Sequence, residues 1–201
     1  MTKTVSALFD SYAAASSAVS ALETSGVPHS DISIVANNSD SWHKGDAASE
    51  AADDAGKGAG IGAAVGGLGG LLTGLGLMAI PGVGPVVAAG WLASTAAGAV
   101  AGAVVGGAAG GIIGGLTEAG VPEHDAHVYA EGVRRGGTLV TARVDDARAS
   151  AAQAVLDRNK AVNLSARGEA YLSSGWSAFD PAAPAYSADE VARERARYSS
   201  M

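Results

Sequence analysis

Hydrophobic and polar residues alternate over three short segments, at residues 4–9, 31–36 and 138–144, which is the period of a half-buried strand. Between and after these segments, apolar residues recur at three- and four-residue spacing, as on one face of a helix. We expect one helix capped by Asp10 or Ser11 and ended by Gly26, one over residues 123–135, and one capped by Asp145 or Asp146. Residues 161–164 are predicted to form a fourth strand.

Two consecutive strand–helix–strand units predict an α+β fold, a ferredoxin-like βαββαβ domain. The pattern divides the chain into five parts. These are a first βαβ half at 1–36, a polar linker at 37–57, a glycine-rich insert at 58–117, a helix with the second βαβ half at 118–164, and a C-terminal tail with a terminal helix at 165–201. The insert therefore interrupts the domain between its second and third strands.

Residues 58–117 contain no Asp, Glu, Lys, Arg or His, although the chain as a whole has 33 charged side chains. Glycine recurs there at strict spacing of four in two series. The two series are Gly58, Gly62, Gly66, Gly70, Gly74 and Gly98, Gly102, Gly106, Gly110, Gly114. Since residues i and i+4 share one side of a helix, each series would line one helical face. The sequence thus predicts a glycine-zipper helical hairpin, with arms at roughly 58–79 and 86–117.

The segment between the two series carries four residues typical of a turn, which are Pro81, Gly82, Gly84 and Pro85. We expect this uncharged segment to be the tip of the hairpin. Each glycine inside a helix costs about 1 kcal/mol relative to alanine in water. Ten aligned glycines are therefore expected to serve close packing between helices.

Two settings satisfy such packing, and both predict self-association into a homo-oligomer. In the first, the hairpin is embedded in the lipid bilayer of the inner (cytoplasmic) membrane, and the α/β domain lies in the cytoplasm because no signal peptide precedes it. In the second, the protein is a soluble cytoplasmic scaffold whose hairpin is buried between subunits. A low-complexity coil is a third interpretation, against which the regular spacing argues.

Several segments together resemble the bacterial general-stress / heat-induced stress protein family. They are the strand–helix–strand opening, the charge-free stretch around residues 80–85, Glu118-Ala119-Gly120-Val121-Pro122 before a helix, and Gly136-Gly137-Thr138-Leu139-Val140. The resemblance covers about residues 3–165. It implies a bacterial, stress-associated protein, and it brings no catalytic residues with it.

Composition excludes several classes of function. The net charge of −7 argues against nucleic-acid binding, and the absence of cysteine removes thiolate metal sites and thiol nucleophiles. His124 and His127 share a helical face, but a metal site needs further ligands. The pair Arg134-Arg135 at a helix end is assigned to the helix dipole rather than to a phosphate.

We therefore predict a non-enzymatic, stress-associated structural protein with no catalytic residue, metal or cofactor. A ferredoxin-like small-molecule sensor is an alternative that rests on fold analogy. In the tail, Trp176, Phe179 and Tyr186 are expected to pack on the chain's own sheet or on a neighbouring subunit. Ser187 and Glu190 form a capping-box pattern before a terminal helix.

Overall fold

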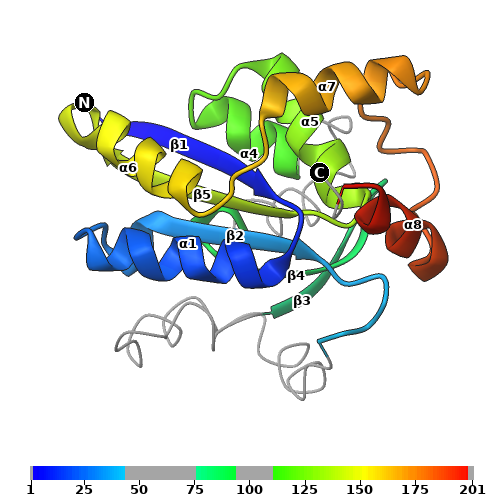
Figure 1. Cartoon of the computed structure of the whole chain (residues 1–201), viewed down its shortest axis with the longest axis horizontal. Coiled ribbons are helices and arrows are strands. Elements are labelled where there is room, and N and C mark those ends of the chain that lie inside the picture. Colours follow the sequence, from blue (N-terminus) through cyan, green and yellow to red (C-terminus); the bar gives the residue numbers. More distant parts are fainter. Residues whose placement is uncertain (1, 44–75, 94–110, 199–201) are drawn as a thin grey trace, which may run out of the picture.

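The computed structural model describes residues 2–43, 76–93 and 111–198 (Figure 1). Five strands form one sheet in the order β1-β5-β2-β4-β3, and every neighbouring pair is antiparallel. The strands are β1 (Thr2–Phe9), β2 (Ile32–Asn37), β3 (Gly76–Ile80), β4 (Gly84–Gly90) and β5 (Thr138–Asp145). The described helices are α1 (Tyr12–Thr24), η1 (His29–Asp31), α4 (Ile112–Glu118), α5 (Glu123–Arg134), α6 (Asp146–Arg158), α7 (Leu164–Ser173) and α8 (Ala188–Tyr198).

Helices α1 and α6 cover one face of the sheet. The Ser11 side chain caps α1 by accepting a hydrogen bond from the Ala14 N–H at 3.2 Å. Both helices bury residues at three- and four-residue spacing against one face of β1, β2 and β5. This confirms the α+β class and the predicted strands at 4–9, 31–36 and 138–144. Strand β5 lies between β1 and β2, as in a split βαβ unit.

Helices α4 and α5 pack on the opposite face. Their buried residues contact Leu8 of β1, Leu139 of β5 and the inner side of the β3–β4 hairpin, and they form a second apolar core. Gly132 of α5 lies so close to β1 that an added Cβ would come within 2.5 Å of the Leu8 side chain. The glycine therefore sets the close approach of α5 to the sheet.

The helical hairpin predicted for 58–117 is wrong at its centre. Residues 76–80 and 84–90 are strands, and Pro81–Val83 are the turn between them. Strand β4 pairs with β2, which is distant in sequence, so a tertiary contact decides the conformation there. Gly82 and Gly84 have φ of +74° and +96°, which reverses the chain between the strands. Within the predicted second arm, residues 91–93 and Ile112–Glu118 are helical.

The predicted fourth strand at 161–164 is also wrong. Leu164 begins α7, which Asn163 caps by accepting a hydrogen bond from the Ala166 N–H at 3.0 Å. Only the N–H of Val162 bonds to β1, through the Leu8 carbonyl at 2.8 Å. The described sheet therefore lacks the last strand of the βαββαβ pattern and carries the β3–β4 hairpin at its other side instead.

Candidate functional site

The predicted packing glycines are mostly outside the described residues. Gly58, Gly62, Gly66, Gly70, Gly74, Gly98, Gly102, Gly106 and Gly110 fall in 44–75 or 94–110. Gly114 lies in α4 and is half-buried. The segment Pro81, Gly82, Gly84 and Pro85, predicted as the tip of a helical hairpin, belongs to the β3–β4 hairpin of the sheet.

Both ends of the 94–110 stretch lie in one buried cluster. Leu92, Ala93 and Ile112 are all in the apolar core beneath α4 and α5. A Cβ on Gly111 would lie 3.7 Å from the Ile80 side chain, next to the β3–β4 turn. The described residues on the two sides of 94–110 therefore lie at the same place in the domain.

The ends of the 44–75 stretch are held on the same sheet. The Trp42 ring lies against Tyr12 of α1 with centroids 4.6 Å apart, and its Nε1–H donates to the Asn37 carbonyl at 2.8 Å. At the other end, Gly76 pairs with Ala88 in the β3–β4 ladder. The described residues that flank 44–75 and 94–110 therefore lie at the β2–β4–β3 side of the domain. Residues 44–75 and 94–110 contain nine of the ten glycines of the two series and are called the glycine-rich stretches below.

The densest group of charges lies between α5 and the C-terminal segment. Glu131 is completely buried, and its carboxylate accepts from Arg135 Nε at 2.6 Å and from Arg134 at 3.2 Å. Arg135 also lies 3.6 Å from Glu194 of α8 and 4.3 Å above the Tyr171 ring. Burial lowers the pKa of Arg135, but the hydrogen bond and charge of Glu131 outweigh it and leave the pKa above its ordinary value.

This network holds the tail on the chain's own fold. Arg134 donates to the Pro184 carbonyl at 3.0 Å and lies 4.8 Å from the Tyr186 ring centroid. Arg195 of α8 donates to the Gly136 carbonyl at 2.9 Å and pairs with Asp40 at 2.6 Å. The assignment of Arg134-Arg135 to a helix dipole missed this role, because both cations pair with a buried carboxylate one turn earlier.

One further observation agrees with a tail that packs on its own domain, since Phe179 is buried in the core beneath α4 and α5. Within the tail, Glu190 accepts from the Ser187 N–H at 2.8 Å, as the capping-box pattern predicts. Arg167 of α7 makes a two-pronged pair with Asp10 at 2.8 and 2.9 Å. These charged side chains are therefore occupied by structural partners.

His127 has a structural role. Its Nδ1 accepts a hydrogen bond from the Phe179 backbone N–H at 3.2 Å, which fixes the tail against α5. His124 is exposed. Over residues 2–43, 76–93 and 111–198, no group of three or more His, Cys, Asp or Glu side chains is arranged to hold a metal ion.

The buried side chains of Tyr129 and Tyr171 have structural contacts rather than acid–base roles. Tyr129 donates its hydroxyl to the Ser6 carbonyl at 2.8 Å. Burial raises the pKa of both Tyr129 and Tyr171 well above the ordinary value, so both hydroxyls stay protonated at physiological pH. Neither can act as a general base under those conditions.

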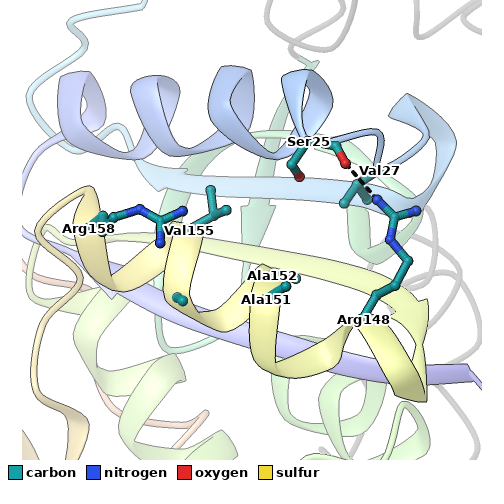
Figure 2. A pocket seen from close by; sticks show the side chains of 8 residues that line it. Ser25, Val27, Arg148, Ala151, Ala152, Val155 and Arg158 are labelled. Carbon is teal, nitrogen blue, oxygen red and sulfur yellow. Dashed lines mark hydrogen bonds between the residues drawn. The ribbon is translucent and has the colours of Figure 1, made fainter.

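A small hollow of about 250 Å³ lies between the end of α1 and α6 (Figure 2). Its floor is apolar, from Val27, Val155 and alanines of α6, and Arg148 and Arg158 stand at its two ends. Arg148 donates to the Ser25 and Gly26 carbonyls at 2.6 and 3.2 Å, where it satisfies the end of α1. The arginine thus closes a helix terminus, and the hollow contains no nucleophile paired with a base.

None of the helices in the described part of the chain is both long and apolar enough to cross a membrane.

Comparison with known proteins relates part of the chain to a protein family. No curated protein and no solved structure matches the chain. Residues 4–84, from β1 to the start of β4, match the family model described as the heat induced stress protein YflT domain. This match supports the resemblance to general stress proteins over that part of the chain, and the resemblance of residues 85–165 stays a prediction.

Proposed function

We propose that this protein is a non-enzymatic, stress-associated protein whose copies associate through the two glycine-rich stretches. The family match over residues 4–84 supports the link to stress. The observation that carries the rest is the anchoring of both stretches, which start and end on one rigid sheet and its core. In this proposal the α/β domain holds the two glycine series in positions where they can contact another copy of the chain.

Chain length favours association between copies over a hairpin that crosses a bilayer. A helix needs about 20 residues to cross a hydrocarbon core of about 30 Å, so crossing and returning needs about 40. Residues 44–75 and 94–110 comprise 32 and 17 residues. Because both ends of each stretch are held on one domain, neither has the length to cross and return.

The chemistry of the repeats suits contact between identical surfaces. Residues 58–117 bring no like charges together, although the whole chain carries −7. Glycine at every fourth position leaves a smooth surface on which two backbones can approach closely. A leucine placed on that surface would hold the backbones apart.

Replacing Gly66 or Gly106 with leucine is expected to reduce the molar mass in solution, measured by size-exclusion chromatography with light scattering. Ala64→Leu and Ala108→Leu are matched controls, because each adds the same side chain two residues from the repeat, on the other side of a helix. The controls should keep the wild-type molar mass. Equal molar mass in all four variants would overturn the proposed association through the glycine repeats.

A further inference from the structure

Strand β1 is a border strand of the described sheet and pairs there with β5. The Leu8 carbonyl accepts from the Val162 N–H, and the Ser6 carbonyl accepts from the Tyr129 hydroxyl, both at 2.8 Å. In an antiparallel pair, alternate residues direct both backbone groups to the same side. The backbone N–H and C=O groups of the even-numbered residues of β1 therefore point away from β5.

The neighbouring ladder gives the same alternation. Asn37 N–H donates to the Gly137 carbonyl, so odd-numbered residues of β5 bond toward β2 and even-numbered ones toward β1. Through the β1–β5 register, odd-numbered residues of β1 use their backbone groups on β5. The N–H and C=O of Thr4 and the N–H of Ser6 thus have no partner within residues 2–43, 76–93 and 111–198.

This open edge forms the floor of a groove of about 650 Å³. One wall comes from the start of α5, with Val121, Pro122, Asp125 and Tyr129, and the other from α6. The two helices lie on opposite faces of the sheet, because Val5 of β1 packs with α6 and Leu8 packs with α5. A strand placed about 4.8 Å from β1 would lie between these walls.

The two walls are acidic, with Asp125 on the α5 wall and Asp157 on the α6 wall. Lys3 also lines the groove, on β1, and its ammonium is 3.9 Å from Asp146, which lies outside the groove. Burial is the main cause that raises the pKa of Tyr129, and the negative charges of Asp125 and Asp157 raise it further. Both carboxylates are therefore close enough to act on the same part of the groove. A second copy of this acidic chain would bring more negative charge to the groove.

We propose that the outer edge of β1 binds an extended, basic segment of a partner protein as an added strand. Its main chain bonds to Thr4 and Ser6. Because successive side chains of a strand point to opposite faces, two adjacent basic residues would meet Asp125 and Asp157, one on each wall. This interaction is separate from the glycine repeats and does not depend on them.

The test uses the full chain and a short capped peptide of alternating Thr and Val with a central Lys-Arg pair. Its affinity is measured by fluorescence anisotropy, and exchange of the β1 amides by hydrogen–deuterium exchange. The peptide should bind and slow the exchange of the β1 segment. A peptide with Glu-Glu at the centre should bind at least about threefold more weakly, because it loses both ion pairs and brings like charges to the two acidic walls.

Variants separate the two parts of the proposal. Asp125→Asn with Asp157→Asn should weaken binding by about three- to tenfold, whereas Glu169→Gln, exposed on α7 and outside the groove, should not. Thr4→Pro removes an outward N–H without removing a bond to β5, and should abolish the added protection while the fold is kept. Unprotected β1 amides, or equal binding of the acidic peptide, would overturn the proposal. So would protection of β1 that rises with protein concentration and without peptide, because a second copy would then occupy the edge.

Discussion

Replacing Glu131 with glutamine is expected to lower the free energy of unfolding by about 3 kcal/mol. Loss of one partner of a buried ion pair typically costs about 3–5 kcal/mol, because the other charge stays buried without compensation. The lower end applies here, since the carboxamide oxygen of glutamine still accepts one hydrogen bond. Arg135 is 9% exposed and the Arg134 side chain is 13% exposed, so water has little access to solvate the two cations once their carboxylate partner is lost.

Urea unfolding followed by circular dichroism measures this effect. Glu169→Gln is the matched control, because Glu169 is exposed on α7 and its replacement should change stability by less than about 0.5 kcal/mol. The tail should also detach more readily in the Glu131 variant, and limited proteolysis between residues 174 and 187 reports that detachment. Equal unfolding midpoints for the two variants would show that Glu131 does not stabilise the packing of the C-terminal segment on α5.

Gly90→Ala is expected to destabilise the protein more than Gly120→Ala, although both glycines have nearly the same backbone conformation. Their φ values are +89° and +88°, so alanine at either position costs about 1–2 kcal/mol of backbone strain. At Gly120 an added Cβ meets nothing within 4 Å. At Gly90 it collides with the Ile32 carbonyl and comes 2.7 Å from the Ser33 Cα, both in the backbone of β2.

The collision adds a second cost to the strain at Gly90. Overpacking of a close contact typically costs a further amount of about 1–3 kcal/mol, and here it would push β4 away from β2. Thermal unfolding of the two variants side by side measures the difference directly. Equal melting temperatures would mean that β4 does not approach β2 as closely as the structure has it.

Local patterns were sufficient to predict the elements whose partners lie in the split βαβ unit. The alternation in β1, β2 and β5, the Ser11 cap and the Ser187–Glu190 box are all signals within a few residues. Each acts on the backbone nearby, so tertiary structure had little to override.

The β3–β4 hairpin could not be predicted in this way. Leu77, Met78 and Val86 continue the apolar composition of the glycine series, and period alone does not separate a short buried strand from a helix. The deciding partner is β2, in which residues 33–37 pair with β4. Ala88, for example, pairs with Val35, which lies about 50 residues earlier in the chain. The predicted strand at 161–164 was wrong for a similar reason, since a segment of four residues that Asn163 interrupts is ambiguous until its neighbours are known.

The charged cluster and the groove also escaped prediction, because burial is not a local property. Glu131 at three and four residues before Arg134 and Arg135 matches an exposed helical ion pair equally well. Helical spacing gave no signal of its burial, because Glu131 lies on the other side of the helix from Ala126, Tyr129, Ala130 and Val133. The outer edge of β1 is open because the described sheet has no strand at 161–164. Since a strand was predicted there, the open edge was not predicted.

Sedimentation velocity of the full chain over a dilution series tests the central claim most directly. The proposal predicts species heavier than the 19.6-kDa chain, which dissociate on dilution and are lost when Gly66→Leu and Gly106→Leu are combined. The variant carrying Ala64→Leu and Ala108→Leu should sediment as the wild type does. A single 19.6-kDa species of the wild type at every concentration would contradict association of copies through the glycine-rich stretches.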